Sequence, residues 1–208
     1  MLINHTPIKN GDTKMRRTLL SLALAVMLTG ASFAQSSWSF DKTHSKIGFS
    51  VDYMLITDVD GYFKKFDGSV TTAKEDFVDA LISFTVDAGS VDTDEPKRDE
   101  HLRSEDFFYT QKFPNFTFKS TSMKKVSGNN YKLVGNLTMR GVTKSVTLNG
   151  TFGGVKKDPW GNTKAGFKLT GKVNRKDYGI NWSKALDGGG FVVGDDVTLN
   201  INVTLIKK

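Results

Sequence analysis

Residues 46–53 read KIGFSVDY, and the spacing of apolar residues in this stretch decides the fold class. Apolar side chains alternate with polar or small ones, which predicts a strand buried on one face. The apolar positions are Ile47, Phe49, Val51 and Tyr53. The same period of two recurs in the stretches 80–86, 131–139, 146–152, 165–173 and 197–205. Turn signals such as Asp60-Gly61 and Asp67-Gly68 lie between the strands, so the sequence predicts an all-β protein of about eight antiparallel strands.

Strands with one apolar face must close into a barrel or pack as a two-sheet sandwich. The stretches 131–139 and 196–206 are long, and at about 3.3 Å per residue the second spans roughly 36 Å. This length favours a single tall eight-stranded barrel, whose interior is either filled by side chains or holds one slender ligand. Gly135, Gly150 and Gly171 fall on inward positions, where a missing side chain leaves room, although strand glycines also mark bends and bulges.

The N-terminus has the pattern of a secretory signal. Arg16 and Arg17 precede the apolar run 19–28, and small residues follow up to Ala34, where we expect cleavage. We interpret residues 1–34 as an upstream extension and signal peptide, with Met1 or Met15 as the start, and residues 35–208 as the mature domain. The apolar run is shorter than the roughly 20 residues of a membrane span, and no other segment approaches that length, so we expect no integral membrane span.

Composition narrows the function classes. The chain has no cysteine, which excludes disulfides, thiol catalysis and lipid attachment through cysteine. The predicted mature chain carries 25 basic and 21 acidic residues, and its lysines are spread along the strands rather than clustered. This pattern is typical of a solvated sheet face, so we expect no nucleic-acid partner.

The stretch 90–118 interrupts the strand pattern with dense charges and aromatics. Asp94 is a candidate cap and Pro96 a first-turn residue for one short helix over roughly Glu95–Ser104. Four aromatic residues then follow within seven positions, and we expect this cluster to lie over a core or an opening. They are Phe107, Phe108, Tyr109 and Phe113.

The polar residues give little support for catalysis. His44 and His101 lack metal-ligand spacing, and no nucleophile elbow, phosphate loop or dinucleotide fingerprint is present, so we expect no cofactor and no metal. The one candidate acid/base set is His101 with Asp99 or Asp106. Charged residues at this spacing also arise on the solvated face of an exposed helix.

Several motifs together resemble the YceI-like family of secreted bacterial lipid-binding proteins, and the resemblance covers nearly all of 38–207. They are DKTHS at 41–45, SVDT at 90–93, RDEHLRSEDFF at 98–108, LTMRGVTK at 137–144 and RKDYGI at 175–180. The resemblance implies a lipocalin-like barrel with one short helix, located in the periplasm. It also implies that a polyisoprenoid, an isoprenoid quinone or a related amphiphile binds in the pore, without catalysis.

Face assignment and resemblance together nominate the ligand-binding residues. The predicted pore residues are Phe49, Val51, Tyr53, Ile82, Phe84, Phe116, Phe118, Leu133, Leu137, Phe167, Leu169, Leu199 and Ile201. At the mouth, Arg98 and Arg103 are candidates to bind an anionic head group beside Phe107 and Phe108. Two other functions remain open, a lipid-modifying enzyme and a structural or adhesion β-domain with a filled core, and a homodimer is possible.

Overall fold

The computed structural model describes residues 1–2 and 35–208, and the secretory signal predicted for residues 1–34 lies almost entirely outside them. Strands dominate the described part of the chain, with a single α-helix of eight residues. The strands are β1 (Ser36–Phe40), β2 (Lys46–Tyr53), β3 (Thr57–Phe63), β4 (Phe66–Thr72), β5 (Leu81–Asp87), β6 (Val91–Asp92), β7 (Asn115–Ser127), β8 (Asn130–Met139), β9 (Val142–Lys157), β10 (Thr163–Asn174) and β11 (Val193–Lys207). The helix is α2 (Pro96–Arg103), and short 3-10 turns are η1 (Ala88–Ser90) and η2 (Arg175–Tyr178).

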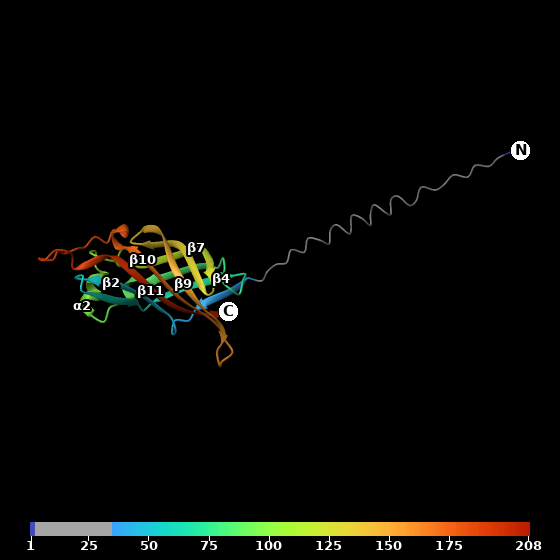
Figure 1. The fold of residues 1–208 in the computed structure, drawn as a ribbon, viewed down its shortest axis with the longest axis horizontal. Helices are drawn as coiled ribbons and strands as arrows, with labels where there is room; N and C mark the ends of the chain where they lie inside the picture. Colours follow the sequence, from blue (N-terminus) through green and yellow to red (C-terminus); the bar gives the residue numbers. More distant parts are fainter. Residues whose placement is uncertain (3–34) are drawn as a thin grey trace. The chain divides into compact units, whose positions relative to one another are not determined.

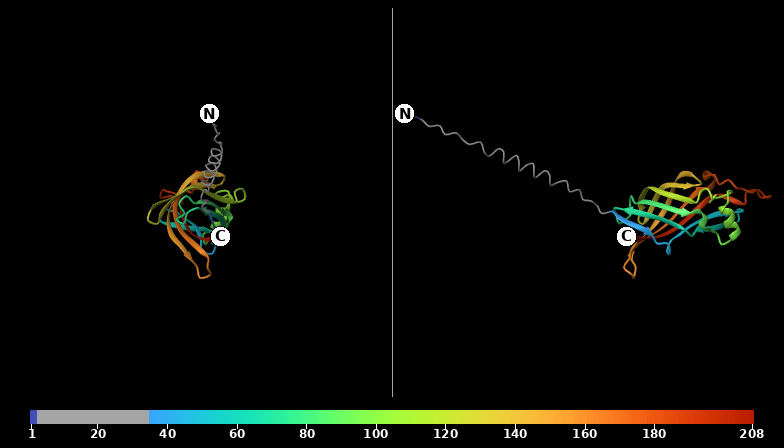
Figure 2. Two further views of the ribbon diagram at one scale, coloured as in Figure 1. Left: turned by 90° about the vertical axis from the view of Figure 1, so that its right-hand side faces the viewer. Right: turned by 180° about the vertical axis from the view of Figure 1, so that it is seen from behind.

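Eight strands form a closed antiparallel ring in the order β1, β4, β5, β7, β8, β9, β10 and β11, and pairing of β11 with β1 closes it. Seen end-on, the strands surround a common axis (Figure 2). The predicted eight-stranded antiparallel barrel with one short helix is therefore confirmed. The helix begins one residue later than expected, because the Glu95 side chain rather than Asp94 caps it and accepts from Arg98 N.

The three remaining strands, β2, β3 and β6, extend the sheet from β11 at one end of the barrel. β11 pairs with β1 near its C-terminus, through Phe40 and Leu205, and with β2 farther back, through Ile47 and Ile201. β2, β3 and β6 then follow one another away from β11. The sheet thus divides at β11, with α2 and the segment 181–192 at one end and the C-terminus at the other (Figure 1).

The predicted turns at Asp60-Gly61 and Asp67-Gly68 were wrong, because both pairs lie inside strands β3 and β4. Their glycines serve packing instead. A Cβ on Gly61 would lie 2.4 Å from Cζ of Phe49, and one on Gly68 would lie 2.9 Å from Cε2 of Phe40. Glycine in a strand marks a place where another group approaches closely, and here the groups are the Phe49 ring at Gly61 and the Ser83 carbonyl together with the Phe40 ring at Gly68.

An aromatic cluster fills the barrel at the end that holds the C-terminus. Phe77, which no solvent reaches, lies in the loop between β4 and β5 with its ring centroid 5.0 Å from that of Trp38 and 5.2 Å from that of Phe167. Tyr131 packs against Phe167 and donates its hydroxyl to the carbonyl of Asp76 at 2.7 Å. This cluster is a solid core, and we call this end of the barrel the filled end.

A candidate ligand cavity inside the barrel

The interior beyond the filled end contains a cavity of about 210 Å³. Thirty-two residues line it, and all but Arg175 are hydrophobic. Most come from alternate positions of the strands, since successive side chains of a strand point to opposite faces. Near the filled end Leu133 and Leu205 are each only 2% exposed, whereas Phe118, Leu137 and Leu199 are half-buried. The barrel is therefore filled at one end and hollow along part of its length.

Twelve of the thirteen predicted pore residues line this cavity. Tyr53 does not, and its side chain is 39% exposed, because it stands at the end of β2 beside the turn to β3. Some lining residues lie outside strands, and the alternation within strands could not predict them. Phe77, Leu102 and Ile180 reach the cavity from a loop, the helix and the segment after η2.

The inward glycines do not enlarge the cavity. A Cβ on Gly135 would lie 2.3 Å from Cζ of Phe118, and one on Gly171 would lie 2.5 Å from Cδ2 of Leu148. Gly150 stands in the same relation to Leu169. Neighbouring side chains therefore occupy the room that these missing side chains leave, which corrects the expectation from the sequence.

Phe107 and Phe108 follow the helix and both line the cavity. The ring of Phe108 lies 5.9 Å from that of Phe63 on β3 and 5.2 Å from that of Phe116 on β7. Strand β6 pairs with β3 alone among the described strands, so no backbone ladder joins β3 and β7 through β6. Phe108 therefore completes the wall with a side chain where strand pairing stops.

The two predicted head-group arginines lie outside the cavity lining, and both donate to nearby protein groups. Arg98 donates Nε to Thr93 Oγ1 at 2.8 Å and Nη2 to the Thr93 carbonyl at 2.7 Å. Arg103 donates Nε to the Gly89 carbonyl at 2.9 Å and Nη2 to the Val91 carbonyl at 3.2 Å. Arg103 thus joins the helix to the backbone of β6 and supports the wall.

Arg175 is the charged residue of the lining, and no sequence pattern singled it out as a cavity residue. Its side chain is 4% exposed and donates to the carbonyls of Gly194, Ile180 and Trp182 and to Asp195 Oδ1. Burial lowers the pKa of the guanidinium from its ordinary value, while Asp195 opposes this change. With these partners, Arg175 fastens the segment after η2 to the start of β11 rather than offering a free cation to a ligand.

Tyr178 is buried nearby, in a cluster with Val146 and Val173. Among the described residues, its hydroxyl is the one fully buried side-chain polar atom without a hydrogen-bond partner. Burial raises the pKa of Tyr178 to about 12, so the group stays neutral at physiological pH.

The candidate acid/base set does not face the cavity. His101 Nε2 lies 2.8 Å from Asp106 Oδ2, but the two side chains are 41% and 55% exposed and neither lines the cavity. Asp99 is buried and accepts from Thr93 N and Thr93 Oγ1 at 2.9 and 2.6 Å. His101 packs its ring against Phe107 and Trp182, so this set has the contacts of a structural cluster.

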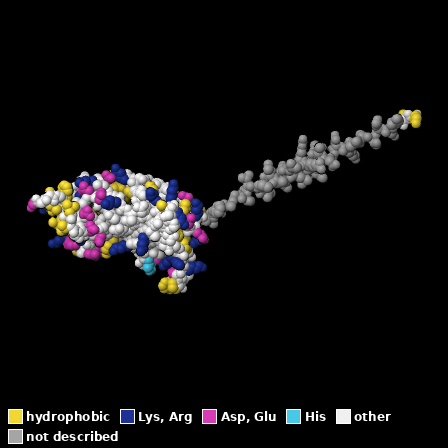
Figure 3. All heavy atoms as spheres, in the orientation of Figure 1, with side chains coloured by type: hydrophobic (Ala, Val, Ile, Leu, Met, Phe, Trp, Pro, Cys, Tyr) yellow, Lys and Arg dark blue, Asp and Glu magenta, His cyan; other side chains and the backbone are white. Residues whose placement is uncertain are grey.

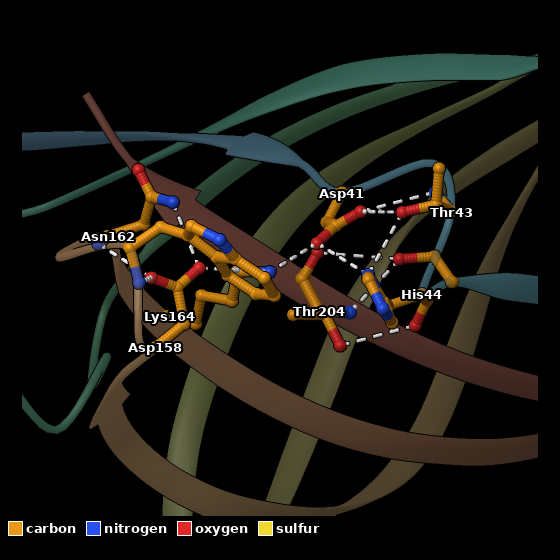
Figure 4. Close-up of polar contacts among 9 residues, drawn as sticks. Asp41, Thr43, His44, Asp158, Asn162, Lys164 and Thr204 are labelled. Atoms are coloured by element: carbon orange, nitrogen blue, oxygen red, sulfur yellow. Dashed lines mark hydrogen bonds and ion pairs between the residues drawn. The ribbon is translucent and has the colours of Figure 1, made fainter.

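A second polar network lies where β11 changes partner from β1 to β2. Asp41 accepts from Lys164 Nζ and interacts with His44 Nδ1, each at 2.9 Å, and Lys164 also pairs with Asp158 (Figure 4). Burial alone would raise the pKa of Asp41, but hydrogen bonds from Lys164, Thr43 and His44 outweigh burial and hold this pKa well below its ordinary value. The network joins the bend between β1 and β2 to the β9–β10 hairpin.

The closed ring and its apolar interior define the class of protein, an antiparallel β-barrel with an internal hydrophobic cavity. The YceI-like domain family matches residues 38–205, and the chain therefore belongs to the YceI-like family. No helix in the described residues is both long and apolar enough to cross a membrane.

Individual relatives agree with this assignment. UPF0312 protein plu2095 of Photorhabdus laumondii is 40% identical over 167 residues, which is 79% of this chain and 86% of that protein. The YCEI protein of Campylobacter jejuni, seen in a crystal structure, is 30% identical with a TM-score of 0.61 and covers 81% of this chain and 96% of its own. A polyisoprenoid binding domain from Saccharophagus degradans is 16% identical, with a TM-score of 0.59 over 82% of this chain and 98% of its own, and shares the fold.

Proposed function

We propose that this protein binds an isoprenoid lipid, an isoprenoid quinone or a similar long-chain amphiphile in the barrel cavity, as a non-catalytic carrier or sequestering protein of the periplasm. The observation that carries the proposal is the lining, in which 31 of 32 residues are hydrophobic. The Saccharophagus domain of the same fold is described as polyisoprenoid binding, which supports the same ligand class. The signal pattern before Ala34 supports export.

Burial of the chain would supply the affinity. Each methylene group moved from water into the cavity contributes about 0.8 kcal/mol. Ten such groups give about 8 kcal/mol, which corresponds to a dissociation constant near 1 μM before the costs of association. Few polar contacts are then needed.

The size of the cavity limits how the ligand enters. Its volume of about 210 Å³ is below the roughly 300–1,000 Å³ of pockets for drug-sized ligands. A slender chain segment fits, whereas a long isoprenoid requires half-buried lining side chains such as Leu137 and Leu199 to move aside. We therefore expect binding to stabilise the barrel and to widen the cavity.

Mass spectrometry of organic extracts from the natively purified protein tests this proposal. Val197→Phe should lower the amount of lipid recovered severalfold, because Val197 lines the cavity and the ring would fill part of it. Thr198→Phe, on the opposite face of the same strand, is the matched control and should retain the lipid. Extracts without any long-chain amphiphile, or equal recovery from both variants, would contradict the proposal.

A further inference from the structure

Four large apolar side chains are exposed at the end of the barrel that holds α2. Tyr53, Leu55 and Ile56 lie at the turn between β2 and β3 and are 39%, 70% and 78% exposed, and Phe191 lies just before β11 and is 50% exposed. We call these four residues the apolar tip. Hydrophobic side chains gather at this end of the molecule (Figure 3).

The two segments form one surface. Met54 N donates to the Val192 carbonyl at 3.0 Å, and Tyr53 pairs with Val193 across the strands. A Cβ on Gly190 would lie 2.9 Å from Cδ1 of Leu55, so the loop before β11 touches the turn. The apolar tip is therefore a continuous patch rather than scattered residues.

The turn itself holds an unfavourable backbone. Met54 and Leu55 have φ of 54° and 61°, in the left-handed region. Ile56 N donates to the Tyr53 carbonyl at 3.2 Å and closes a β-turn whose two central residues are Met54 and Leu55, and such positions favour Asn and Gly because bulky side chains are strained there. The chain thus places a half-buried Met54 and an exposed Leu55 where small or polar residues would be relaxed, and such strain is often kept at functional sites.

The apolar tip continues into the cavity. Val193, which pairs with Tyr53, lines the cavity, and so does Val51, which lies two residues before Tyr53 on the same face of β2. An alkyl chain could therefore pass between the tip and the interior while it remains in contact with hydrophobic side chains. This continuity connects the patch with the ligand class of the proposed function.

The charges around the tip narrow the choice of partner. Asp52 and Asp58 are cross-strand neighbours beside the turn, and burial and the Asp52 carboxylate raise the pKa of Asp58. Lys176 lies on the other side, with Nζ 5.7 Å from the ring centroid of Phe191. The two carboxylates beside the turn disfavour a strongly anionic surface, so the patch suits a zwitterionic lipid interface, into which exposed apolar side chains insert.

We propose that the apolar tip docks on a zwitterionic bilayer, so that the amphiphile passes directly between the membrane and the cavity during contact. This inference rests on the proposed function, because it assigns the route by which that ligand enters and leaves. Trp160, which is 81% exposed at the tip of the β9–β10 hairpin, is the competing membrane contact at the other end of the barrel.

Transfer of a fluorescent polyene fatty acid from the protein to phosphatidylcholine vesicles tests the inference. For the wild-type protein the transfer rate should rise with vesicle concentration, as contact-dependent transfer requires. The double variant Leu55→Ser, Ile56→Ser should bind the probe as before but transfer it at least about fivefold more slowly, since the inserted side chains are lost. Trp160→Ser is the matched control and should transfer at the wild-type rate.

Flotation with probe-free phosphatidylcholine vesicles separates docking from ligand binding. The wild-type protein and Trp160→Ser should float with the vesicles, and the double variant should not. If the barrel fails to bind the probe but the wild-type protein still floats, the proposed function is wrong in its ligand while docking stands. The inference is overturned if transfer is independent of vesicle concentration, if Trp160→Ser loses transfer instead, or if the patch pairs two copies, so that the double variant has half the wild-type mass in solution.

Discussion

Asp41 Oδ2 lies 2.9 Å from Lys164 Nζ, although 123 residues separate them in the sequence. This contact joins the bend between β1 and β2 to the first residues of β10, at the place where the barrel closes. The side chains are 7% and 21% exposed, so solvent screens the pair less than a surface ion pair.

Asp41→Asn should lower the free energy of unfolding by about 2 kcal/mol at pH 7, because it removes a charged acceptor of three side-chain hydrogen bonds. The pKa of Asp41 is lowered in the folded state, so its contribution is fully present above the unfolded-state value of 3.8 and is lost as the pH falls below it. Urea unfolding at pH 7 and pH 3 measures this. The difference between wild type and variant should shrink at pH 3, and a constant difference would contradict the assignment.

Tyr178→Phe should leave the unfolding free energy unchanged or raise it by about 1 kcal/mol, because the lost hydroxyl has no hydrogen-bond partner. Tyr131→Phe is the matched control and should lose about 1 kcal/mol, since that hydroxyl donates to the Asp76 carbonyl. Thermal unfolding of both variants measures the contrast. A clear loss in Tyr178→Phe would mean that its hydroxyl is satisfied.

The buried Tyr178 hydroxyl should also make the stability of the protein depend on pH in the alkaline range. Its pKa is raised from 10.0 to about 12 in the folded state, so above pH 10 the unfolded chain loses the hydroxyl proton while the folded chain keeps it. The free energy of unfolding is therefore unaffected by this group below pH 10 and falls as the pH rises toward 12. The wild-type protein should therefore lose more stability over this range than Tyr178→Phe. Denaturant midpoints at several alkaline pH values test this, and parallel losses would refute it.

Gly135→Ala should cost about 2 kcal/mol, because the new Cβ would lie 2.3 Å from Cζ of Phe118 and 2.6 Å from the Lys119 carbonyl oxygen. Gly166→Ala is the control within the same barrel, since nothing lies within 4 Å of a Cβ there. Urea midpoints compare the two. Equal stability of both variants would contradict this prediction, because it would mean that Phe118 and the Lys119 carbonyl on β7 move away from the new Cβ without loss of stability.

Arg103→Met should weaken the cavity wall, because the Gly89 and Val91 carbonyls lose their guanidinium partner. We expect a loss of about 2 kcal/mol and faster hydrogen exchange over residues 88–92. Lys97→Met, an exposed change on the same helix, should alter neither. If Arg103 instead binds a head group directly, lipid recovery should fall without any change in exchange.

Strands with a clear alternation, β2, β5, β8, β9, β10 and β11, could be predicted from the sequence because alternation is a local property, whereas β3 and β4 were missed at the places where turns were expected. The stretch 46–53 is strand β2 as expected, and twelve of thirteen nominated pore residues line the cavity. The polar residues were harder to assign. Arg98 and Arg103 are of the residue type that binds anionic head groups, which is why the sequence nominated them. In the fold they donate to backbone and hydroxyl groups, which only the folded chain brings near.

The sequence by itself determined which side chains face inward along the strands that alternate clearly, because the period of two depends only on backbone geometry. It also carried the motifs of the YceI-like family. Only the tertiary structure decided that Phe77 fills one end, that Phe108 completes the wall between β3 and β7, and that Phe118 occupies the room beside Gly135. These contacts join residues far apart in the chain, and their geometry depends on how the barrel closes rather than on any local pattern.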